Sequence, residues 1–244
     1  MKRRLLSAFL AVMMVLTMAP VAFAANTEPT TEYVAQVDGT NYATLADAIE
    51  AANNKTLTLL KDVNGQIVIP EGKTVTLDLN GNVLKMTGGG SVIKVESGGN
   101  LTIQDSNTST PHNFNPDCKD LAWHIDMWKL DDNGSEIVSG GVITGGGGDQ
   151  NNGGGVLVAG GTLTMTGGSI VGCSARSRGG GVYLSKDSDT GKSGTFIMTG
   201  GSIIGCAAQL GGGVYVAPEC TFAMATGSNI HNCIANNDGG GVIN

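Results

Sequence analysis

The residues best suited to chemistry lie in one segment, 107–135, which interrupts a glycine-rich repetitive chain. This insert holds both tryptophans of the sequence, together with histidine and acidic side chains, among them Trp123, His124, Asp126 and Trp128. Indole rings stack on sugar rings, and Asp and His hydrogen-bond to hydroxyls, so the insert is a candidate saccharide site. Long loops in compact folds are often functional. In the alternative interpretation, both tryptophans simply attach the insert to the rest of the protein.

Two tyrosines, Tyr183 and Tyr215, occupy the same place in successive repeats of the chain. They alternate with valines that are expected to point inward, so together with Leu157 they are predicted to form an outward stripe. A row of phenol rings can bind an extended polymer, but aromatic ladders also stabilise stacked repeats. Both interpretations stay open from the sequence.

Three cysteines, Cys173, Cys206 and Cys233, recur at one position of three successive repeats. Stacked strands would place their Cα atoms about 4.8 Å apart, within the roughly 4.4–6.8 Å that a disulfide tolerates. Three stacked cysteines cannot all pair among themselves, so we predict a structural ladder of mostly free, small apolar thiols. No histidine accompanies the ladder, and a row of ligands does not suit zinc, so no metal site is predicted there.

Acidic residues are nearly absent from the strand-like runs of the repeats. A lyase would need clustered acids for Ca²⁺ and a Lys or Arg base, and a hydrolase would need paired carboxylates. The acids of the repeat region stand in its loops and lack diagnostic spacing: Asp149, Asp187, Asp189 and Asp238. The sequence therefore predicts no catalytic residue, no metal and no cofactor.

The repeat that positions these residues begins Gly-Gly-Gly-Val and returns at residues 153, 179, 211 and 239. Each unit contains three runs of alternating β-branched or aromatic residues separated by glycines, which predicts three strands and three turns. A unit of this size cannot bury its own apolar face, so successive units must stack with parallel strands. The expected inward ladders are Val156, Val182, Val214 and Val242; Met165, Met198 and Met224; and Ile170, Ile203 and Ile230.

The two ends of the chain differ from the repeats. Residues 1–24 contain three basic residues, an apolar stretch and the motif Ala22-Phe23-Ala24, which predicts a signal peptide cleaved after Ala24. We expect 25–32 to be a linker, 33–55 an N-terminal cap with a strand and a short helix, and 56–244 the solenoid with its insert. The last unit is incomplete, which predicts either a truncated piece of a longer protein or end-to-end pairing.

The composition limits the partners of the exported chain. Loss of the three basic residues of the signal changes the net charge from −7 to −10, which disfavours nucleic acid as a partner. No segment after the signal approaches the roughly 18 apolar residues of a membrane span, so membrane insertion is not expected. The predicted location is outside the cell or on the bacterial cell surface.

The segment from Tyr33 to Ile103 resembles the start of right-handed parallel β-helix proteins of bacterial surfaces. The resemblance is carried by VDGTNYATLADAIEAANNKTLTLLKDV, GKTVTLDLNG and GGNLTIQDS, and later by the units GGGVYV and GTFIMTGGSI. In place of the asparagine that many such repeats carry after the third strand, this chain has the cysteine ladder. The resemblance implies an all-β, right-handed parallel β-helix solenoid of pectin-lyase-like fold with an N-terminal cap.

The same resemblance implies an adhesin-like, non-catalytic scaffold that contacts glycans or a host or bacterial surface protein. Two alternatives stay open, because this fold also carries enzymes and spacers. One is a polysaccharide lyase or hydrolase, and the other is a purely structural stalk. A shared acid cluster would favour the enzyme, an exposed aromatic platform the binder, and neither feature the stalk.

Overall fold

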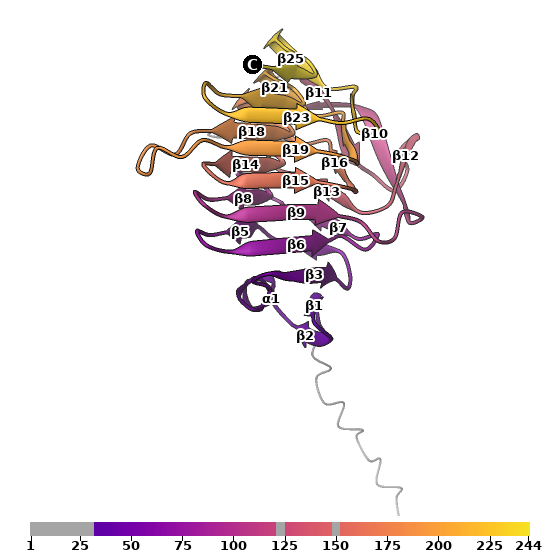
Figure 1. Ribbon diagram of the computed structural model, residues 1–244. Coiled ribbons are helices and arrows are strands. Elements are labelled where there is room, and N and C mark those ends of the chain that lie inside the picture. The colour runs from indigo at the N-terminus through magenta and orange to yellow at the C-terminus, as the bar shows by residue number, and fades with distance from the viewer. Residues whose placement is uncertain (1–31, 121–124, 148–151) are drawn as a thin grey trace, which may run out of the picture. The chain divides into compact units, whose positions relative to one another are not determined.

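The computed structural model describes residues 32–120, 125–147 and 152–244. Strands of two to five residues stack in parallel as successive turns of a solenoid (Figure 1), as the repeat predicts. Sheet A contains β3 (Lys55–Leu59), β6 (Thr74–Asp78), β9 (Asn100–Gln104), β15 (Thr162–Met165), β19 (Thr195–Met198) and β23 (Thr221–Met224). Sheet B contains β4 (Val63–Asn64), β7 (Val83–Lys85), β13 (Val142–Thr144), β16 (Ser169–Val171), β20 (Ser202–Ile204) and β24 (Asn229–His231).

Two further parallel sheets complete the turns of the solenoid. Sheet C contains β5 (Ile67–Ile69), β8 (Ile93–Val95), β14 (Val156–Ala159), β18 (Val182–Ser185), β22 (Val214–Val216) and β26 (Val242–Ile243). A short sheet between sheets B and C contains β17 (Ser174–Arg178), β21 (Ala207–Leu210) and β25 (Ile234–Asp238). Each complete repeat unit therefore has four strands, so the prediction of three strands per unit was wrong by one. The predicted fold class, a parallel β-helix, is confirmed.

The strands pair with the register that the repeat predicts. Val156 pairs with Val182, which pairs with Val214, and the methionine and isoleucine ladders are in register in the same way. The ladders fill the core, because side chains of alternate residues all point to one side of a strand. Burial is complete through most of the stack, whereas Met224 and Val242 of the last turn are 44% and 41% exposed.

The N-terminal end of the core is covered by a strand pair and one helix, as predicted. Strands β1 (Ala35–Val37) and β2 (Thr40–Tyr42) are antiparallel, and β1 joins the edge of sheet A through β3. Helix α1 (Leu45–Ala51) begins after Thr44, whose hydroxyl oxygen accepts a hydrogen bond from the Asp47 N–H at 3.2 Å. The helix buries Leu45, Ala48 and Ile49 against the first turns, so its apolar side caps the core.

Each position of the Gly-Gly-Gly motif requires glycine for a different reason, as residues 179–181 show. Gly179 has φ +65°, a conformation that side chains disfavour. A Cβ on Gly180 would overlap the Ala207 carbonyl oxygen of the next turn. A Cβ on Gly181 would lie 2.7 Å from the Ile203 side chain in the core. The motif therefore lets the backbone of one turn approach both the next turn and the core.

The insert forms an antiparallel sheet on the outside of sheet B. Strand β10 (Pro111–Asp120) pairs with β11 (Ile125–Leu130) and with β12 (Glu136–Ser139), and we call these three strands the insert sheet. Figure 1 shows it standing beside the stacked turns. Its contact with sheet B forms a second apolar cluster, separate from the core, of Phe114, Trp128, Val138, Val83, Val142, Val171 and Ile204.

Candidate functional site

The insert sheet brings Trp128 into packing contact with the solenoid. Its side chain is only 9% exposed, and its ring lies 6.4 Å from that of Phe114, centroid to centroid. Its backbone N–H donates to the Gly205 carbonyl oxygen at 3.0 Å. This geometry gives Trp128 the attaching role, which was one of the two interpretations of its sequence position. Trp123 and His124 lie outside the described residues, and of Asp126 only the backbone, in β11, is described.

Two glycines make this docking possible. Gly172 and Gly205 both have φ +58°, and a Cβ on either would overlap Trp128, at its carbonyl oxygen and its ring respectively. In the next repeat the equivalent residue is Asn232, which has nearly the same φ of +55°. Asparagine tolerates this conformation, so the conformation alone does not require glycine. The change from Gly-Cys to Asn-Cys was the sequence signal that marks where the insert sheet docks.

Tyr183 and Tyr215 form the predicted outward stripe on sheet C. They pair in register, both are half-buried, and their ring centroids lie 5.6 Å apart with the planes tilted by 46°. The guanidinium carbon of Arg178 lies 5.3 Å from the centroid of the Tyr215 ring, a cation–π distance. Sequence analysis identified the tyrosines but not Arg178, because β17 belongs to the neighbouring sheet. The result is a partly exposed aromatic surface with a cation beside it.

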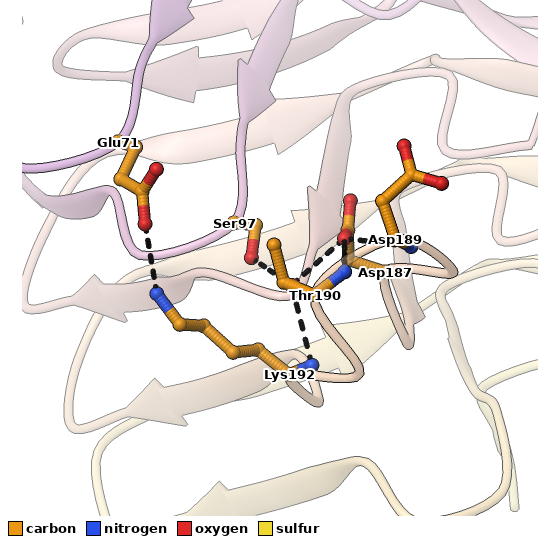
Figure 2. Close-up of polar contacts among 6 residues, drawn as sticks. All are labelled: Glu71, Ser97, Asp187, Asp189, Thr190 and Lys192. Carbon is orange, nitrogen blue, oxygen red and sulfur yellow. Dashed lines mark hydrogen bonds and ion pairs between the residues drawn. The ribbon is translucent and has the colours of Figure 1, made fainter.

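A polar corner follows the ends of the sheet C strands (Figure 2). The loop after β18 is closed by Asp187, whose Oδ1 accepts hydrogen bonds from the Thr190 N–H at 2.7 Å and the Thr190 hydroxyl at 2.8 Å. These hydrogen bonds lower the pKa of the Asp187 carboxyl. Across the corner, Thr190 and Ser97 share a hydrogen bond of 2.6 Å, and Lys192 Nζ lies 3.0 Å from Glu71 Oε1. The contacts join loops of different turns.

This corner contains a shallow hollow of about 250 Å³. Its lining includes Ala159 at the end of β14, together with Lys94, Glu96 and Asp187. Lys94 Nζ is 3.0 Å from Glu96 Oε1. The volume is below the roughly 300–1,000 Å³ of small-molecule sites. The hollow therefore suits contact with part of a larger partner.

The acids of the corner are arranged for hydrogen bonding. Glu71 and Glu96 each pair with a lysine. The hydrogen bonds from Thr190 lower the pKa of the Asp187 carboxyl, so it stays ionised to lower pH than an ordinary aspartate. An ionised carboxylate that already accepts hydrogen bonds from its own loop is a poor general acid. Within the described residues, no group of three or more His, Cys, Asp or Glu side chains could hold a metal ion.

The cysteine ladder lies inside the solenoid at the corner after sheet B. Cys173 and Cys206 are fully buried, and each thiol lies near carbonyl oxygens of its own turn and the preceding one, Cys206 Sγ being 3.7 Å from Ile170 O. Burial raises the pKa of the Cys206 thiol, and hydrogen bonding with Cys206 raises that of Cys233. Cys173, Cys206 and Cys233 are free in the structure. A neutral buried thiol is neither a nucleophile nor a metal ligand.

Comparison of the chain with protein-family models, with curated proteins and with solved structures gives no match. Among the described residues, no helix has the length and apolar character needed to cross a membrane. The parallel β-helix is thus established from the structure itself, and the functional interpretation depends on its surfaces.

Proposed function

We propose that the chain is an exported, non-catalytic β-helix scaffold that binds a polysaccharide along the outer face of sheet C. The observation that carries the proposal is the pair Tyr183 and Tyr215, stacked in register on adjacent turns and accessible from outside. Adjacent turns of a β-helix are about 4.8 Å apart, so an extended polymer lying across them meets both rings. Phenol rings contact the apolar faces of sugars, and their hydroxyls hydrogen-bond.

The polar groups around the tyrosines support a saccharide partner. Arg178 lies beside Tyr215. Lys94 pairs with Leu157, which pairs with Tyr183, so it stands in the same outward column of sheet C, and it lines the hollow together with Glu96. Sugar hydroxyls both donate and accept hydrogen bonds, so they can use carboxylate and ammonium groups together. A bacterial surface or host protein is the second class of partner that the adhesin-like resemblance suggests.

The protonation and pairing of the carboxylates in the polar corner favour binding without catalysis. A glycoside hydrolase needs one protonated carboxyl and a second carboxylate at a set separation. In the polar corner Asp187 has a lowered pKa, and Glu71 is paired with Lys192. The proposed location, outside the cell, rests on the basic and apolar residues of 1–24 and on the Ala22-Phe23-Ala24 motif.

The experiment is retention of residues 25–244 on a panel of immobilised polysaccharides, with the eluted polymer examined for shortening. We expect retention on at least one polysaccharide with the polymer intact. Retention should be lost in the double variant Tyr183→Ala/Tyr215→Ala and kept in Tyr183→Phe/Tyr215→Phe, which preserves both rings. Thermal unfolding of each variant would show that the solenoid is intact.

Other outcomes would contradict the proposal in distinct ways. Shortened polymer would support a lyase or hydrolase of the same fold. Absence of retention across the panel would support a structural stalk. Retention that survives removal of both tyrosine rings would place the binding surface elsewhere.

A further inference from the structure

A cleft of about 440 Å³ lies between the insert sheet and sheet B, on a different side of the solenoid from the tyrosine stripe. Its apolar lining comes from Met86, which follows β7, and from Met127 and Leu130 of β11. Thr144 and Lys85 face it from sheet B. The volume falls within the roughly 300–1,000 Å³ of small-molecule sites.

The cleft exists because one outward column of sheet B changes character along the stack. Lys85, Thr144, Val171 and Ile204 occupy this column in register on four successive turns. Val171 and Ile204 are covered by the apolar cluster that contains Trp128. At Thr144 and Lys85 the same column is polar, and the insert sheet leaves a gap over it. The cleft is therefore bounded by rigid strands on one side and by a docked strand on the other.

The charges of the cleft are distinctive. Most lysine side chains that the structure describes form an ion pair with a carboxylate: Lys55, Lys61, Lys73, Lys94, Lys186 and Lys192. Among the lysines whose side chains the structure describes, Lys85 and Lys129 form no ion pair, and both line this cleft. Of the residues whose side chains the structure describes, the lining includes no Asp or Glu. A chain with a net charge of −7 thus keeps two uncompensated cations at one apolar cleft.

We propose that this cleft binds a small organic anion, a carboxylate or sulfate carried on an apolar body. The anionic group lies between Lys85 and Lys129, where each ammonium donates a charge-assisted hydrogen bond. The apolar body lies against Met86, Met127 and Leu130, and methionine side chains adapt to ligands of varied shape. The ligand contacts both the solenoid and the insert sheet, so its binding stabilises their contact.

The test is calorimetric titration of residues 25–244 with octyl sulfate below its micellar concentration. We expect saturable binding at one site, with octanol and inorganic sulfate each binding about tenfold more weakly or not at all, because each supplies half of the interaction. Octyltrimethylammonium, which has the same chain and the opposite charge, should not bind. Added salt should weaken the binding of octyl sulfate.

Variants assign the binding to the cleft. Lys85→Gln/Lys129→Gln should lower the affinity for octyl sulfate about tenfold, whereas Lys192→Gln, which removes a lysine paired with Glu71, should leave it unchanged. Circular dichroism would show that the double variant stays folded. Unchanged affinity in the double variant, equal affinity for octanol, or the absence of binding would each overturn the proposal. Because the tyrosine stripe is untouched, retention on polysaccharide should not change in the double variant.

Discussion

Sheets B and C are built from the same repeat, yet their outer faces differ. The outer side of sheet B carries Val83, Val142, Val171 and Ile204, and the insert sheet covers them. The outer side of sheet C carries Tyr183 and Tyr215 and stays accessible. Inward positions are alike in both sheets because every turn must fill the same core. The outward residues therefore indicate which face of the solenoid is covered and which face is available to a partner.

The largest expected effect is at the covered face. Trp128→Ala should destabilise the protein by about 3–5 kcal/mol, the range for removing a large buried aromatic side chain. The variant leaves a cavity between Phe114 and sheet B, so the insert sheet loses its main contact. Chemical denaturation followed by circular dichroism measures this difference. A loss below about 1 kcal/mol would mean that the insert sheet docks without Trp128.

The second prediction separates backbone strain from steric contact with the insert sheet. Gly205→Ala adds a methyl group against the Trp128 ring at φ +58°, whereas Gly191→Ala adds one at φ +70° with no atom within 4 Å. Both variants incur the cost of a side chain in the left-handed region, about 1–2 kcal/mol. The free energy of unfolding of Gly205→Ala should be lower than that of Gly191→Ala by roughly 2 kcal/mol, because the added methyl group disturbs the packing of Trp128. Equal unfolding midpoints would show that Trp128 does not lie on Gly205.

The accessible face should respond more weakly. Tyr183→Ala should lower the free energy of unfolding by about 0.5–1.5 kcal/mol, because it removes one aromatic pair and a half-buried ring. Tyr183→Phe should have almost no effect on stability. A loss from Tyr183→Ala as large as that from Trp128→Ala would mean that the stripe is part of the packed structure, which would favour the stabilising interpretation.

The smallest effect concerns the polar corner beside sheet C. The pKa of Asp187 is lowered from its ordinary value of 3.8, so the loop contacts are fully present at neutral pH and are lost as the pH falls below that value. The chemical shift of the Thr190 amide, which donates to Asp187 Oδ1, should titrate with a midpoint below 3.8. Asp187→Asn serves as the control, because it removes the titration. A midpoint at or above 3.8 would contradict the hydrogen-bonded loop.

The inward ladders could be predicted from the sequence, because alternation within a strand and the period of the repeat together fix which residues stack. The docking of the insert could not, since it depends on contacts between Trp128 and turns that form 44 and 77 residues later, at Gly172 and Gly205. The same holds for the corner, where Lys192 meets Glu71. Neither contact leaves a periodic pattern in the sequence. The one sequence sign is Asn232, which replaces the glycine of the earlier repeats at the turn where Trp128 no longer lies against the backbone.

The insert sheet also changes how the solenoid is expected to unfold. In an ideal repeat protein each turn contacts only its neighbours, and unfolding can spread from one end as a series of weakly coupled steps. Here His112 contacts the Gly81 carbonyl oxygen at 3.0 Å, and the Trp128 N–H bonds to Gly205 at 3.0 Å, three turns further along. One element thus fastens four successive turns together. Strand β11 also contacts β25, one turn further along. The turns that the insert sheet contacts should therefore unfold as a single cooperative block.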